Sequence, residues 1–116
     1  MSGSWHSIEI QRAIDREESR RLHLLRLDAV ERARRIAALL KKTFNVSKVT
    51  LYGSLVEGGF DVRSDIDLMI DGFSGPFWRM YSEAGALADP FPLSIVCMED
   101  AAPSLVEHVL RRGVEL

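Results

Sequence analysis

Residues 51–68 have the sequence LYGSLVEGGFDVRSDIDL, which holds the most informative pattern of the chain. A short apolar segment ends at Gly53-Ser54, where glycine lets the backbone bend sharply and approach a ligand closely. Asp65 and Asp67 then flank an isoleucine at the start of a second apolar segment. Because side chains alternate along a strand, the two carboxylates should share one face while the isoleucine points to the other.

These groups suit a phosphate ligand and a divalent cation. Amides at the start of the helical turn after Gly53, together with the Ser54 hydroxyl, form an anion site. Carboxylates placed side by side, as at Asp65 and Asp67, suit Mg²⁺, which keeps several waters and also binds phosphate oxygens. A phosphate cradle that faces a magnesium-binding pair predicts a site for a nucleoside triphosphate.

Hydropathy and turn residues on either side of this stretch predict the remaining elements. We expect, in order, a helix over 7–42, a strand over 48–52, a helical turn over 54–57, a strand over 66–70, a helix over 74–87, a strand over 93–98 and a helix over 100–112. This order predicts an α/β (α+β) fold, a small mixed β-sheet flanked by helices. Residues 1–116 should form one domain, with a helical extension over 1–45 and a motif-bearing core over 46–116.

Composition excludes several classes of protein. Of 116 residues, 47% are hydrophobic and 28% are charged, which is usual for a globular domain and unlike a disordered or collagen-like chain. The net charge of −2 argues against a generic nucleic-acid or membrane-surface binder. No apolar run approaches the ~20 residues that span a bilayer, and the lone Cys97 excludes an internal disulfide. We therefore expect a cytoplasmic protein with neither a membrane nor a nucleic acid as direct partner.

The two parts of the chain differ in charge. Residues 1–47 carry ten basic and six acidic side chains, whereas residues 48–116 carry five basic and eleven acidic ones. The basic helix has more leucines than one narrow stripe needs, among them Leu22 and Leu24. It is therefore either a solvated face or a surface for an acidic partner or a second copy of the chain. Its charged segment over 15–21 is a solvated turn, a break between two helices, or an arm that leans on a partner.

The pattern Gly-Ser, ten residues, then Asp-x-Asp in an apolar strand resembles the minimal nucleotidyltransferases of the DNA polymerase β-like superfamily. The resemblance covers residues 46–113. It implies the palm-like fold of polymerase β, preceded here by a long N-terminal helix. The site residues that it implies are Gly53, Ser54 and Ser64 for the nucleotide, and Asp65 and Asp67 for metal binding and catalysis.

The same resemblance implies an activity and a partner. Such proteins transfer a nucleotidyl group, often AMP from ATP, to a hydroxyl of a protein or small molecule. The implied cofactor is Mg²⁺ or Mn²⁺, with ATP or another nucleoside triphosphate as substrate. The implied partner is a small helical protein of HEPN type, because minimal nucleotidyltransferases commonly act as antitoxins of HEPN toxins. A homodimer through the N-terminal helix is the other association that the sequence predicts.

Two residues depart from the family pattern. A third carboxylate usually lies on the next strand, where this chain has Ser94, a neutral side chain that is a poor base and a weak ligand. Many relatives have arginine just before the glycine that closes the turn, where this chain has Glu57. The alternative function is therefore that of a catalytically weakened or inactive member that binds a nucleotide or a partner.

Other side chains with catalytic or binding chemistry have plainer explanations. The acids that would have to replace the missing carboxylate are Asp61, Asp71, Glu99 and Asp100. Only Asp61 lies in a loop that could swing towards the pair, because the others lie too far along a strand or beyond its catalytic end. Phe77, Trp78 and Tyr81 fall within two helical turns and should belong to the core rather than to a base-stacking platform.

Overall fold

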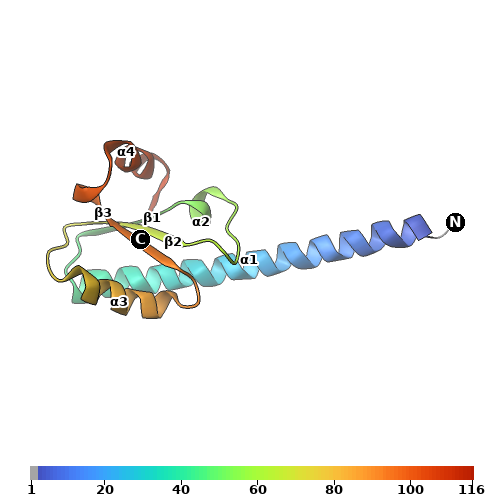
Figure 1. Ribbon diagram of the computed structural model, residues 1–116, viewed down its shortest axis with the longest axis horizontal. Coiled ribbons are helices and arrows are strands. Elements are labelled where there is room, and N and C mark those ends of the chain that lie inside the picture. Colours follow the sequence, from blue (N-terminus) through green and yellow to red (C-terminus); the bar gives the residue numbers. More distant parts are fainter. Residues whose placement is uncertain (1–2) are drawn as a thin grey trace.

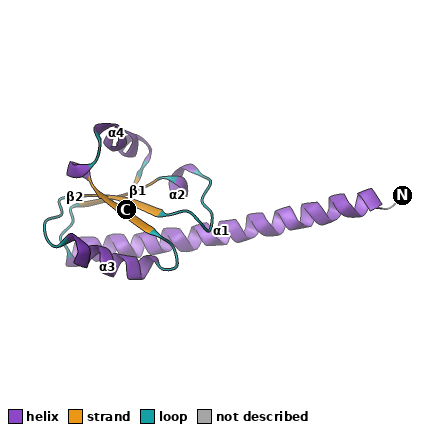
Figure 2. Cartoon of the chain, in the orientation of Figure 1, coloured by secondary structure: helices purple, strands orange, loops and turns teal. Residues whose placement is uncertain are grey.

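The computed structural model describes the backbone of residues 3–116 and the side chains from Ser7 onwards. Figure 1 shows how its elements are arranged. In chain order they are α1 (Gly3–Thr43), β1 (Lys48–Tyr52), α2 (Ser54–Glu57), β2 (Ile66–Asp71), α3 (Phe77–Ala88), β3 (Leu93–Cys97), the 3₁₀ helix η1 (Met98–Asp100), α4 (Pro103–Arg112) and β4 (Val114–Glu115). Helices lie on both sides of the small sheet (Figure 2), which confirms the predicted α/β class.

The four strands form one mixed sheet in the order β3-β2-β1-β4. β1 pairs antiparallel with β2 and β4, whereas β2 and β3 are parallel. A parallel pair needs a crossover connection, and α3 provides it between β2 and β3. In this register Asp67 lies opposite Tyr52 on β1 and opposite Ser94 on β3. The topology therefore brings three distant segments into one row across the sheet.

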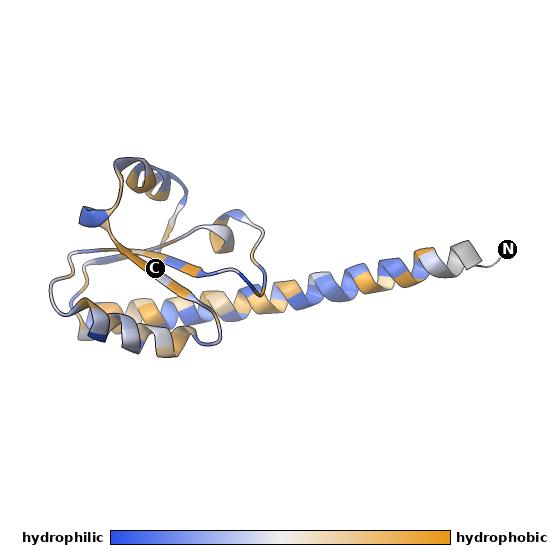
Figure 3. Cartoon of the chain, in the orientation of Figure 1, coloured by the Kyte–Doolittle hydropathy of each residue, from blue (hydrophilic) through white to orange (hydrophobic). Residues whose placement is uncertain are grey.

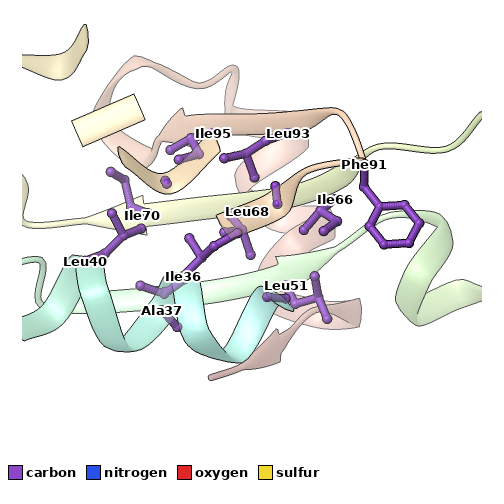
Figure 4. Packing of buried hydrophobic residues seen from close by; sticks show 14 of the residues in the cluster. Ile36, Ala37, Leu40, Leu51, Ile66, Leu68, Ile70, Phe91, Leu93 and Ile95 are labelled. Carbon is purple, nitrogen blue, oxygen red and sulfur yellow. The ribbon is translucent and has the colours of Figure 1, made fainter. Parts of the chain in front are cut away.

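One face of the sheet packs against α3 and the second half of α1. Alternation along β2 points Ile66, Leu68 and Ile70 to this face, and all three are fully buried. Figure 4 shows these side chains beside those of α1 and β3, with the labelled neighbours Ile36, Leu40, Leu93 and Ile95. Arg32 of α1 donates a hydrogen bond of 3.1 Å to the carbonyl of Leu87 in α3, so the two helices are also joined directly.

The opposite face of the sheet is covered only in part. α4 packs over β1 and η1 packs over β2. Thr50 and Met69 lie opposite each other on these strands, and both are buried, as is Val109 of α4. The row that contains Asp67 lies beyond this cover and is only half-buried. The accessible part of this face is therefore the end where β1 stops and where β2 and β3 begin.

The long N-terminal helix is continuous. α1 runs through residues 15–21 without the predicted turn or break. That segment contains neither Gly nor Pro, and it carries ion pairs one turn apart, such as Glu17 with Arg21 at 3.4 Å. Asn45, just after the helix, has a φ of 56°, a left-handed conformation that suits asparagine at a helix end. Neither α1 nor any other helix among the described residues has the apolar length needed to cross a membrane.

The C-terminal part differs from the sequence prediction in two places. The last helix begins at Pro103 rather than at residue 100, because proline has no N–H and fits only the first turn. The residues before it form η1 instead. After Gly113 the chain continues as β4, a strand of two residues that the sequence pattern did not predict. It pairs with β1 and extends the sheet at that edge.

The aromatic residues of α3 do not all belong to the core. Trp78 is 78% exposed, so the prediction that it packs in the interior was wrong. The buried side of α3 is formed by Met80, Ala84 and Ala88, which are spaced four residues apart. Trp78 lies about 200° away from Met80 around the helix and therefore points to solvent.

Candidate functional site

The accessible part of the sheet carries a row of three polar side chains. Asp67 of β2 is the Cα partner of both Tyr52 of β1 and Ser94 of β3. Paired residues on neighbouring strands point to the same face, and the strands are about 4.8 Å apart. All three side chains are half-buried. The row therefore places one carboxylate between two hydroxyl groups.

The turn after β1 lies against this row. Gly53 has a φ of +81°, which L side chains rarely adopt. A Cβ at this position would lie 2.3 Å from Oδ2 of Asp67, so only glycine lets the backbone come this close to the carboxylate. The carbonyl of Gly53 accepts hydrogen bonds from the amides of Val56 (3.1 Å) and Glu57 (2.9 Å), which form α2. The turn thus brings the start of α2, with Ser54, next to β2.

Asp65 and Asp67 are two interacting carboxylates. Asp65 precedes β2 and is exposed, whereas Asp67 lies within the strand and is half-buried. Burial raises the pKa of Asp67, and the negative charge of Asp65 raises it further. Burial also raises the pKa of Tyr52, with a second contribution from the charge of Asp67. Burial is the larger cause of both shifts, and the neighbouring negative charge adds to it. A divalent cation bound between the carboxylates would neutralise that charge.

The loop before Asp65 is held by its own hydrogen bonds. The Asp61 carboxylate accepts hydrogen bonds from the amide of Arg63 (2.8 Å) and the hydroxyl of Ser64 (3.3 Å). The Ser64 hydroxyl in turn accepts one from the amide of Asp61 (3.0 Å). Asp61 is therefore engaged within the turn rather than replacing the third carboxylate. The role of Ser64 as a nucleotide ligand stays a prediction, since the contacts of its hydroxyl lie within the loop.

Within the described part of the chain, Asp65 and Asp67 have no third acidic or histidine neighbour placed to share a metal ion. The acids at the far ends of β2 and β3 are Asp71, Glu99 and Asp100. The β3 neighbour of Asp67 is Ser94. Two carboxylates and a hydroxyl are few donors, but they fit one Mg²⁺ ion, which keeps several waters and binds phosphate oxygens.

Sequence reasoning missed two residues near this site. Nε2 of His108 in α4 lies 3.0 Å from Oε2 of Glu57 in α2. Glu57 stands where the family pattern has arginine, and here it contacts another helix of its own chain. No spacing in the sequence links two residues so far apart. Tyr52 was also missed, although its place at the end of a strand, directly before Gly53, was an available signal.

The family model for polymerase beta nucleotidyltransferases matches residues 34–116. The chain belongs to this nucleotidyltransferase family. The match begins within α1 and includes the whole sheet, the Gly53 turn and both carboxylates. Nucleotidyltransferases transfer a nucleotidyl group from a nucleoside triphosphate and generally use a divalent metal ion, which agrees with the donors at Asp65 and Asp67.

Solved structures have the same fold as this nucleotidyltransferase. A protein described as a minimal nucleotidyltransferase is 26% identical, with a TM-score of 0.63 over 82% of this chain and 95% of that chain. Two mutant structures of the toxin-antitoxin MntA-HpeT match with TM-scores of 0.60 and 0.58. They are 18% and 22% identical, each over 72% of this chain and over 70% and 69% of theirs, and they show the fold alone. The comparison with curated proteins gave no match.

Proposed function

We propose that this nucleotidyltransferase carries out a metal-dependent transfer of AMP from ATP to a hydroxyl of a partner protein. The observation that carries the proposal is the pair of Asp65 and Asp67 beside the Gly53 turn, on the part of the sheet face that α4 leaves accessible. The two carboxylates would hold Mg²⁺ or Mn²⁺. Gly53 and Ser54 would hold the triphosphate, with Ser64 as a further nucleotide ligand.

The residues of the site would orient the reacting groups. The Gly53 turn, which lies close to Asp67, would position the triphosphate against the start of β2. A bound divalent metal ion supplies positive charge to the phosphate oxygens. The acceptor oxygen forms a bond to the α-phosphorus, the bond from that phosphorus to the bridging oxygen breaks, and pyrophosphate leaves with this oxygen. The proton of the acceptor hydroxyl passes to solvent, because the neutral Ser94 is a poor acceptor for it.

The acceptor that we propose is a small helical protein of HEPN type, with this chain as the antitoxin of the pair. The similar fold of the toxin-antitoxin MntA-HpeT supports a toxin as partner. The lone Cys97 predicts a reducing cytoplasm as the place where the two proteins meet.

Ser94 favours a second candidate function. It lies beside Asp67, at the position where the family pattern has the third carboxylate. Loss of a positioned general base typically costs about 10²–10⁴-fold in rate. The alternative is therefore a weakened or inactive family member that binds ATP or the partner and neutralises the partner by contact alone.

Label transfer distinguishes these two functions. The chain is incubated with ATP labelled on the α-phosphate, Mg²⁺ or Mn²⁺, and a purified HEPN-type partner. Metal-dependent labelling of the partner that is lost with Asp67→Asn supports the transferase. Asp71→Asn, on the same strand and the same face but at its far end, is the matched control and should keep the activity.

The second function is supported if no label is transferred while calorimetry shows binding of ATP with Mg²⁺ or of the partner. A chain that transfers no label and binds neither ligand would contradict both functions.

A further inference from the structure

The first half of α1 extends beyond the sheet (Figure 1). From Ala29 onwards the helix packs on the sheet, and Ala29 and Ile36 are fully buried. Over residues 7–28, here called the free half, every side chain is exposed except those of Glu17 and Leu25, which are half-buried. Figure 3 shows that apolar and polar residues alternate along it. Exposed isoleucines and leucines on such a helix indicate an interaction surface.

A heptad pattern runs along the free half. Six residues are spaced alternately by four and three positions, namely Ile10, Ile14, Glu17, Arg21, Leu24 and Asp28. Residues at this spacing form one narrow stripe, which is the contact line of a two-helix coiled coil. We call this stripe the seam. Its charged pair, Glu17 and Arg21, lies in the middle and has an apolar residue on either side.

The seam borders a groove. Four of its six residues line, together with residues 61–63, a space of about 810 Å³ between α1 and the loop that leads to Asp65. Val62 on this loop is 71% exposed, and Ile14 on the opposite wall is 52% exposed. Apolar side chains therefore face this groove from both the helix and the loop.

We propose that the groove receives the α1 helix of a second copy of this chain, in antiparallel orientation. Pairing two seams about residue 19 sets Ile14 opposite Leu24 of the second copy, and Glu17 opposite Arg21 of the second copy. Two-fold symmetry repeats each contact, so two opposite-charge pairs at the centre are flanked by two apolar pairs, and Ile10 lies opposite Asp28 at each end of the seam. A parallel pairing would instead set Glu17 against Glu17 and Arg21 against Arg21, which is unfavourable.

The charge of the free half also favours a second copy. Residues 7–28 contain five acidic and five basic side chains. The basic excess seen in the N-terminal part of the sequence lies in residues 29–43, which contain five basic side chains and one acidic one. A neutral and self-complementary helix does not repel its own copy, and it has no net attraction for an acidic partner. The structure therefore favours the second copy over the acidic partner for this surface.

Charge reversal on the seam tests the proposal, which does not depend on nucleotide transfer. The full chain should be a dimer in sedimentation equilibrium. Glu17→Arg and Arg21→Glu should each raise the dissociation constant about tenfold or more, because each sets like charges against one another at both central pairs. An equimolar mixture of these two variants should recover a dimer, because every central pair in the mixed dimer then joins opposite charges.

Two control variants make the same charge changes away from the seam. Arg12→Glu and Asp15→Arg lie on other sides of the helix and should leave the dissociation constant within about twofold of the native value. Circular dichroism establishes that each variant keeps its helix content. If the seam variants lose helix content, the proposal is tested by the oligomeric state of the native chain alone. A dimer then supports the proposal, and a monomer overturns it.

Four results would overturn the proposal. They are a native chain that is monomeric at about 100 μM, seam variants that dimerise as tightly as the native chain, controls that weaken the dimer as much as the seam variants do, and a mixture that stays monomeric. A monomeric chain whose seam variants lose binding to a helical toxin would assign the groove to that partner instead of a second copy.

Discussion

Strands β2 and β3 lie side by side in parallel, yet only one of them carries an acid on the accessible face. Asp67 of β2 and Ser94 of β3 are direct partners in the register. On the opposite face the two strands are alike, with buried side chains at Ile66, Leu68, Leu93 and Ile95. The difference between the strands is therefore confined to the side of the sheet that carries the proposed site.

This contrast shows how a fold and an activity can change independently. Alternate residues of a strand point to opposite faces, so one face can keep its apolar packing while the other changes its charge. Substitutions at the row of Asp67 and Ser94 should therefore alter chemistry strongly and stability weakly. Substitutions that disturb the backbone next to the row should lower stability as well as activity.

The largest effect on activity is expected when the negative charge of Asp67 in β2 is removed. Asp67→Asn should lower label transfer about 10³-fold, because an amide keeps the shape of the side chain but does not neutralise a cation. If the native chain transfers label too slowly for such a decrease to be measured, Asp67→Asn is compared with the native aspartate in a chain that also carries Ser94→Asp. Asp71→Asn serves as the control, and an equal loss in both variants would contradict a special role for Asp67.

The second-largest effect on activity is expected when a carboxylate is added to β3 at the position of Ser94. Ser94→Asp should raise the transfer rate about 10²-fold or more, because it adds a base and a metal ligand next to Asp67. Ser94→Ala is the control, since it removes the hydroxyl without adding charge, and it should not raise the rate. An aspartate variant that is no faster than the native chain would mean that the charge of β3 does not limit the reaction.

A backbone change at the site should also lower stability. Gly53→Ala should lower the free energy of unfolding by about 1–3 kcal/mol, because its φ of +81° is strained for alanine and its Cβ would meet the Asp67 carboxylate. Gly85→Ala in α3 is the matched control, since a Cβ there has no neighbour within 4 Å. It should stabilise the chain by about 0.5–1 kcal/mol, as expected within a helix. Urea unfolding of both variants measures the difference, and equal effects would contradict the close approach at Gly53.

The smallest effect concerns the pH dependence of stability. Because the folded chain raises the pKa of Asp67 above its ordinary value, it binds this proton more tightly than the unfolded chain. Stability is therefore lost as pH rises from the ordinary pKa to the raised one, and the loss persists at neutral pH. Asp67→Asn removes this cost and should raise the Tm at pH 7 by about 1–3 °C in calorimetry without added metal. A lower Tm for the variant at pH 7 would contradict the raised pKa.

Much of the fold could be predicted because it depends on local patterns. β1 and α2 begin and end at the predicted residues, since an apolar run of period two is followed directly by Gly53 and a short turn. β4 could not be predicted in this way, because two residues contain no periodicity and the strand exists only through its pairing with β1. Trp78 was misplaced because its neighbours in sequence do not show which side of α3 faces the core.

The candidate site likewise combines features that local sequence patterns predict with features that depend on the folded chain. The acid pair of Asp65 and Asp67, the glycine turn and the long helix could be predicted from the sequence, because alternation and helical spacing act over a few residues. The folded chain was needed to show that Tyr52 and Ser94 flank Asp67 and that half of α1 has no cover from the sheet. Strand register and helix packing join residues far apart in the chain, and no local pattern encodes those distances.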